Sequence, residues 1–96
     1  MKLENLKEEN VVLKFHAKWC GPCKILKTLT DNLDKEGVFN EYGYKLIEVD
    51  VDDFSDLAEE YNVRSLPTVF FMKKGDLIEK KVGLVNKNEI IKILNK

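Results

Sequence analysis

The chain has 96 residues, of which 44% are hydrophobic and 34% charged, and this length supports one globular core but not two. A formal net charge of -1 supplies no basic field for a nucleic acid or an anionic membrane surface, so we expect neither partner. No apolar run approaches the ~20 residues of a membrane span, and the start MKLENLKEEN lacks the apolar core of a signal peptide. We therefore expect one domain over residues 1–96, working as a cytoplasmic monomer.

The first half of the chain predicts helices and strands in alternation. A short helix is expected over Lys2 to Glu9, and the β-branched, apolar run Val11 to His16 is typical of a strand. A longer helix follows over Cys23 to Glu36, where Gly37 suits its C-terminal cap, and Tyr44 to Val51 is again strand-like. The apolar stripe expected on the long helix consists of Ile25, Leu26, Leu29 and Leu33.

The second half predicts a helix, a hairpin and a closing helix. Ser55 to Tyr61 is helix-like, with Leu57, Ala58 and Tyr61 facing inward. After Pro67, the runs TVFFM and LIEKKV flank the turn KKGD, which is typical of a β-hairpin. Asn86, with Glu89 three residues later, resembles a capping box that begins the last helix. Its expected apolar stripe consists of Ile90, Ile91 and Leu94.

This order of elements predicts an α/β fold. Two strand-helix-strand crossovers followed by a hairpin imply a mixed sheet with helices on both faces. Sites in such sheets form beyond the carboxyl ends of parallel strands, and Cys20 lies just past the first strand. The phenylalanines expected in the core are Phe39, Phe54, Phe70 and Phe71.

The two cysteines of the chain, Cys20 and Cys23, stand three positions apart in WCGPCK. In a reducing cytosol such a pair indicates catalysis or metal binding. Residues three apart share a helix face, so the two sulfurs can reach disulfide range. Free N–H groups and the helix dipole favour a thiolate at Cys20, which predicts Cys20 as the nucleophile and Cys23 as the resolving thiol. Gly21 keeps the approach to the sulfur open, and Pro22 begins the helix.

Four motifs together resemble the thioredoxin family. They are WCGPCK at 19–24, VRSLPT at 63–68, KKGD at 73–76 and KVG at 81–83. The resemblance implies a thioredoxin fold, with a central mixed four-stranded sheet flanked by helices on both faces. It also implies an enzyme that reduces disulfides in protein substrates, needs no cofactor of its own and is reduced by an NADPH-dependent thioredoxin reductase.

The resemblance also implies a substrate-docking rim. Pro67 corresponds to the family's cis-proline, which leaves the backbone of Leu66 free to pair with a substrate segment. The alternative for Pro67 is an ordinary proline at the start of a strand. The apolar rim would consist of Trp19, Gly21, Pro22, Leu66, Val82, Gly83 and Leu84, and for Leu84 simple packing is an equal alternative.

The sequence departs from the family pattern in two places. Only about ten residues precede VVLKF, so the usual amino-terminal strand is expected to be absent. The family usually has an aspartate six residues before the nucleophilic cysteine, thought to accept the resolving thiol's proton, and this chain has Lys14 there. The family lysine that pairs with that aspartate is replaced by Glu48.

These two replacements suggest that the charges are exchanged beneath the active site. Lys14 and Glu48 lie in adjacent predicted strands, which would bring them together. We hypothesise that Glu48 accepts the Cys23 proton and that Lys14 favours the thiolate. In the alternative, Lys14 reaches solvent and Glu48 is a surface acid, with Asp50 as the aligned residue instead.

Other function classes remain open at the level of sequence. A thioredoxin-fold binding or scaffold subunit would have dispensable cysteines, and a degraded motif would be its signature. A glutaredoxin would more typically carry a Pro-Tyr or similar pair between the cysteines, and a periplasmic oxidase would need a signal peptide. A metal site using His16 with the two cysteines lacks a second C-x-x-C to complete a tetrahedral set, so we expect no metal.

Overall fold

Four strands form the centre of the molecule. The computed structural model describes residues 8–96, with strands β1 (Asn10–His16), β2 (Tyr44–Asp50), β3 (Thr68–Lys73) and β4 (Asp76–Val82). They form one sheet in the order β2-β1-β3-β4, in which only the β1–β2 pair is parallel. The expected mixed four-stranded sheet is therefore confirmed within these residues. The helix expected over Lys2 to Glu9 falls almost entirely outside the described part of the chain.

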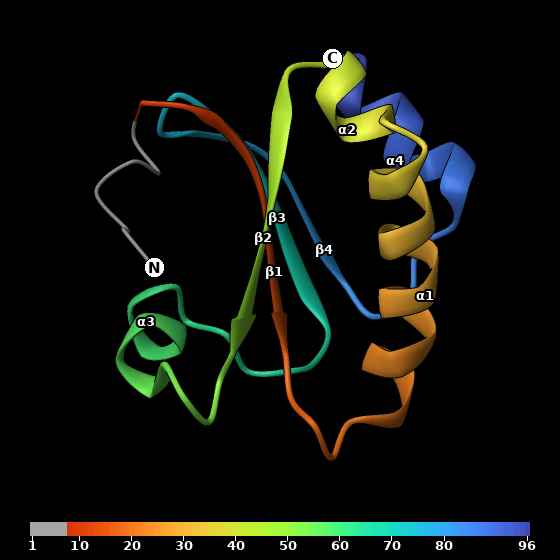
Figure 1. Ribbon diagram of the computed structural model, residues 1–96. Coiled ribbons are helices and arrows are strands. Elements are labelled where there is room, and N and C mark those ends of the chain that lie inside the picture. Colours follow the sequence, from red (N-terminus) through yellow and green to blue (C-terminus); the bar gives the residue numbers. More distant parts are fainter. Residues whose placement is uncertain (1–7) are drawn as a thin grey trace.

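Helices cover both faces of this sheet, as the sequence predicted. Helices α1 (Gly21–Lys35), α2 (Val38–Glu41) and α4 (Lys87–Leu94) lie on one face, and α3 (Ser55–Glu60) lies on the other (Figure 1). Within residues 8–96, none of the helices has the length and apolarity needed to cross a membrane.

The sheet separates two apolar cores. Because successive side chains of a strand point to opposite faces, Val12 of β1 packs in the core beneath α1 and α4, whereas Leu13 and Phe15 pack in the core beneath α3. Other members of the first core are Leu26, Leu33, Phe39, Phe71 and Ile90, and the second also holds Val11, Leu57 and Phe70. Burial on both faces fixes β1 at the centre of the fold, and with it the position of the residues that follow β1.

Helix α1 begins directly at the cysteine motif. Cys20 is its N-cap and Pro22 stands in its first turn, where a missing N–H leaves no helical bond unmade. The helix therefore begins two residues earlier than the apolar pattern predicted. It ends at Lys35, and Gly37 follows in the left-handed conformation, with φ 79°, which glycine adopts without strain.

Several core expectations are wrong in detail. Ile25 is 62% exposed, because the inward face of α1 is set by Cys23, Leu26, Thr30 and Leu33. Phe54 is 37% exposed, since it precedes α3 instead of lying on its buried face.

Helix α4 begins where the sequence predicted, but its buried face differs in one residue. The capping box of Asn86 and Glu89 is confirmed at the start of α4. The buried residues of this helix are Ile90, Ile93 and Leu94, and Ile91 is only partly buried. The four-residue helix α2 was not predicted, although Phe39 within it is buried as expected.

Candidate active site

Cys20 and Cys23 form a disulfide at the point where β1 ends and α1 begins. Their Cα atoms are 5.3 Å apart, and both residues are buried. The Cys20 Sγ accepts a hydrogen bond from the backbone N–H of Cys23 at 3.2 Å. A sulfur that caps a helix N-terminus in this way is favoured as a thiolate, because the amide and the helix dipole both stabilise negative charge.

A groove of about 650 Å³ borders Cys20. Of the predicted docking residues, the structure brings four together here beside Cys20: Trp19, Gly21, Pro22 and Leu66. The far wall was not predicted and consists of Val51, Ala58, Val63, Arg64 and Ser65. Three of these, Val63, Arg64 and Ser65, belong to the VRSLPT motif, so the position of that motif could have indicated this wall. The groove therefore lies between the cysteine motif, the end of β2 and the segment around α3.

The remaining docking residues flank this groove and do not line it. The Leu66-Pro67 peptide bond is cis, as the resemblance implied, and Pro67 is buried. The N–H of Gly83 donates to the Pro67 carbonyl at 2.8 Å, and Val82 pairs with Thr68. Val82 and Leu84 are exposed, so this part of the predicted rim lies next to Pro67 and open to contact.

Trp19 is held by a contact that sequence reasoning missed. Its indole is 70% exposed, and its Nε1 donates a hydrogen bond to Asp52 Oδ2 at 3.0 Å. Asp52 follows β2 and is separated from Trp19 by 33 positions, so no local pattern connects the two residues. The bond fixes a large apolar ring at the edge of the groove.

Lys14 and Glu48 form the ion pair that was expected beneath the cysteines. The two residues are register partners on β1 and β2, and Lys14 Nζ lies 3.0 Å from Glu48 Oε1. Lys14 is only 1% exposed and also donates to Thr30 Oγ1 at 2.7 Å. The alternative in which Lys14 reaches solvent is wrong, and Asp50 is the register partner of His16 instead.

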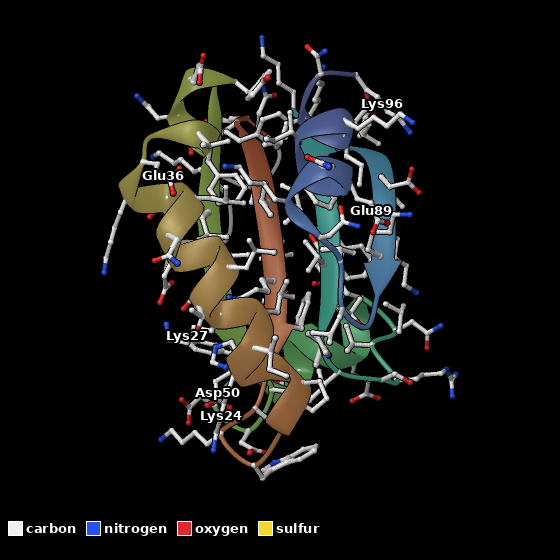
Figure 2. All side chains as sticks on the ribbon, turned by 90° about the vertical axis from the view of Figure 1, so that its right-hand side faces the viewer. Lys24, Lys27, Glu36, Asp50, Glu89 and Lys96 are labelled. Atoms are coloured by element: carbon white, nitrogen blue, oxygen red, sulfur yellow. A yellow bond between two sulfur atoms is a disulfide. The ribbon has the colours of Figure 1, made fainter. Side chains whose placement is uncertain are left out.

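A second cation, Lys27, contacts the same carboxylate. Lys27 Nζ lies 3.3 Å from Glu48 Oε2 and 3.2 Å from Asp31 Oδ2. Figure 2 shows Lys24, Lys27 and Asp50 gathered at the end of the molecule where α1 begins. Lys27 was missed by sequence reasoning, although it stands one helical turn after Cys23, where it shares a face with that cysteine.

The two lysines determine the charge of Glu48. Burial by itself would raise the pKa of the Glu48 carboxyl, but the contacts and charges of Lys14, followed by those of Lys27, outweigh it and hold that pKa below its usual value of 4.5. Within residues 8–96, Glu48 Oε1 has no aligned hydrogen-bond donor, so its 3.0 Å approach to Lys14 is an ion pair. Glu48 is thus an anion at neutral pH.

Cys23 borders a different cavity from Cys20. A hollow of about 290 Å³ is lined by His16, Ala17, Lys18, Cys23, Lys24 and Lys27. Cys23 is absent from the wall of the larger groove, and Cys20 is absent from the wall of this hollow. The two sulfurs of one disulfide therefore meet two different environments.

Comparison with known proteins identifies the family. The chain matches the family model described as Thioredoxin over residues 2–96. It is 36% identical over 86 residues to a thioredoxin of Mycoplasmoides gallisepticum, covering 90% of this chain and 82% of that protein. It is 42% identical over 90 residues to the mitochondrial thioredoxin of Bos taurus, covering 93% of this chain but only 52% of the bovine protein.

Solved structures agree with these sequence relatives. A thioredoxin-2 of the malaria parasite superimposes with a TM-score of 0.79 at 34% identity, covering 91% of this chain and 82% of that chain. The thioredoxin of Fasciola hepatica gives a TM-score of 0.79 at 28% identity, covering 97% and 85%. With the C-x-x-C disulfide at the start of α1, these matches show that the chain belongs to the thioredoxin family of dithiol-disulfide oxidoreductases.

Proposed function

We propose that this protein reduces disulfides in protein substrates, with Cys20 as the attacking nucleophile and Cys23 as the resolving thiol. The observation that carries this assignment is the asymmetry of the pair. Cys20 caps α1 and borders the large groove, whereas Cys23 borders the smaller hollow behind it. A substrate in the groove therefore meets the Cys20 sulfur first.

The reaction proceeds in two exchanges. The Cys20 thiolate attacks one sulfur of the substrate disulfide, a Cys20-substrate disulfide forms, and the other substrate sulfur leaves as a thiolate. Cys23 then attacks the Cys20 sulfur, the bond to the substrate breaks, and the second substrate sulfur leaves. The substrate gains two electrons, and the protein is left with the Cys20–Cys23 disulfide that the structure contains.

Family membership implies disulfide substrates and a reductase. As finer assignments, we propose an NADPH-dependent thioredoxin reductase as the electron donor and extended segments of proteins as substrates. The Leu66 backbone beside Cys20 supports the second assignment, because an extended segment can pair with it in strand fashion. A reducing compartment, such as the cytosol, suits this direction of electron flow, and the relatives include mitochondrial proteins.

We propose an electrostatic role for the Lys14–Glu48 pair. The ammonium of Lys14 favours thiolate character at Cys23 through space, and Glu48 holds that ammonium in a buried site. The low pKa of Glu48 makes its carboxylate a weak base at neutral pH, which argues against the hypothesis that Glu48 accepts the Cys23 proton. We further propose that residues 1–96 act as one domain and as a monomer.

The trapping of substrates tests the two cysteine roles. Cys23→Ser should accumulate long-lived mixed disulfides with a protein such as insulin, because nothing resolves them. Cys20→Ser should form none, since the remaining thiol lies outside the groove. Mass spectrometry of the adducts measures both. Equal trapping by the two variants would overturn the assignment. Full biological activity of the variant that carries both Cys20→Ser and Cys23→Ser would instead favour a scaffold role.

A further inference from the structure

The resolving step described above leaves one proton without a destination. Cys23 must lose its thiol proton to become a nucleophile, and it is buried. The wall of its hollow contains three lysines, Lys18, Lys24 and Lys27, together with His16 and Ala17. Lysine ammonium groups are donors only, so they cannot accept this proton. His16 is the one residue of this wall that can.

The way in which β1 lies along α1 places His16 near Cys23. Lys14 contacts Thr30, which stands seven positions after Cys23 and hence about 10 Å further along the helix axis. His16 lies two residues beyond Lys14 on the same face of β1, about 6.6 Å closer to the cysteine end of the sheet. The imidazole therefore lies at the Cys23 end of α1, and the Lys14–Glu48 pair lies deeper along the helix.

The nearby carboxylates are engaged elsewhere. Glu48 is committed to Lys14 and Lys27, and its lowered pKa makes it a poor proton acceptor. Asp50 is the register partner of His16, but its Oδ1 accepts the backbone N–H of Asp52 at 2.8 Å, and it does not line the hollow of Cys23.

We propose that His16 is the general base of the resolving step and takes the proton of the Cys23 thiol. This proposal rests on the proposed function. As the proton moves to the neutral imidazole, the Cys23 sulfur bonds to the Cys20 sulfur and the Cys20-substrate bond breaks. The electron pair leaves with the substrate sulfur, and the imidazolium then gives its proton to solvent. Over the two exchanges together, the thiols of Cys20 and Cys23 become one disulfide, and the substrate disulfide becomes two thiols.

The charges around His16 fit this transfer. Lys18, Lys24 and Lys27 line the same hollow as His16. Asp50 is its register partner on β2, and the Lys14–Glu48 pair lies two residues back on the same face. The lysine charges favour the thiolate that the transfer creates on Cys23. The carboxylate of Asp50 favours the imidazolium that the same transfer creates on His16.

Rapid mixing with Ellman's disulfide separates the two exchanges. The attack by Cys20 releases one coloured thiolate at a rate proportional to reagent concentration, and the resolving step releases the second at a rate independent of it. General base catalysis contributes typically ~10²-fold or more. We therefore expect His16→Phe and His16→Gln to slow the second phase at pH 7 by about 100-fold, with the first phase within about twofold of wild type.

The pH profile distinguishes a base from a merely structural residue. As the pH rises from 7 to 9, hydroxide increasingly takes up the thiol proton in place of a protein base, so the deficit of His16→Phe should shrink to about threefold or less at pH 9. Either an unchanged second phase in His16→Phe or a deficit that does not shrink between pH 7 and pH 9 would overturn the proposal.

A second measurement tests the proximity itself. His16 is the only histidine of the chain, so its ring signal in an NMR spectrum is unambiguous. We expect that signal to shift between the disulfide and dithiol forms, and an identical signal in both would overturn the proposal. Substrate trapping by Cys23→Ser is independent of His16. A failure of the base assignment would therefore leave trapping intact, whereas a failure of the proposed function would abolish it.

Discussion

Lys14 and Glu48 face each other across the parallel strands β1 and β2, with the buried ammonium 3.0 Å from the carboxylate. The two partners are unequal. Lys14 is 1% exposed, whereas Glu48 is 28% exposed and is shared with Lys27. Loss of Glu48 therefore leaves the Lys14 charge with less compensation than loss of Lys14 leaves the Glu48 charge.

This inequality predicts unequal costs of mutation. Glu48→Gln removes the negative charge beside a buried ammonium and leaves it neutral oxygens only, those of the new amide and of the Thr30 hydroxyl. We expect this change to lower the free energy of unfolding by about 3 kcal/mol, the lower end of the range for broken buried pairs. Lys14→Met should cost clearly less, because methionine suits the buried site and Glu48 keeps Lys27. Urea unfolding of both variants and of the double variant measures the coupling. Costs that add to within ~0.5 kcal/mol would show that the pair is not energetically coupled.

Glu48 also predicts a pH dependence of stability. Its pKa in the folded protein lies below the ordinary value of 4.5, so the folded state prefers the charged carboxylate. The resulting stabilisation is fully present above pH 4.5 and is lost as the pH falls through the lowered pKa. The difference in unfolding free energy between wild type and Glu48→Gln should thus be constant from pH 6 to pH 7 and shrink below about pH 4.5. A difference that stays constant down to pH 3 would contradict the assignment.

The bond between Trp19 and Asp52 predicts an effect on substrates with little effect on stability. Asp52→Ala should change the free energy of unfolding by less than about 1 kcal/mol, because both residues are exposed. It should slow the reduction of protein disulfides several-fold, since the indole loses its fixed position at the groove. Asp53→Ala is the matched control, because the Asp53 side chain makes no hydrogen bond within residues 8–96. If both variants reduce insulin equally fast, the hydrogen bond from Trp19 to Asp52 does not contribute to substrate reduction.

The proposed direction of electron flow predicts the reduction potential. Equilibration of the Cys20–Cys23 pair with a glutathione or dithiothreitol buffer should give a value near or below the cytosolic glutathione poise of roughly -220 to -320 mV. Quantifying the two forms by thiol alkylation and mass spectrometry makes the measurement. A potential close to about -120 mV, typical of periplasmic oxidants, would mean that the protein donates disulfides instead of reducing them.

The sequence alone determined the features that depend on local spacing. Two cysteines three positions apart around Gly-Pro are sufficient for a disulfide at a helix start, and the Asn86–Glu89 box fixes where α4 begins. The order of apolar runs determined the mixed sheet and its helices on both faces. The exchange of Lys14 and Glu48 could also be predicted, because parallel strands in register place matched positions side by side.

Only the tertiary structure decided which contacts distant residues make. The bond from Trp19 to Asp52 and the approach of Lys27 to Glu48 join segments 33 and 21 positions apart, and no periodicity encodes such pairs. The exposure of Ile25 depends on the rotation of α1 against the sheet, which an apolar stripe fixes only to within about one residue. The separation of Cys20 and Cys23 into two cavities likewise arises from how β1, α1 and the segment around α3 pack. Packing in three dimensions sets the surroundings of a charge or a thiol, and those surroundings control its reactivity.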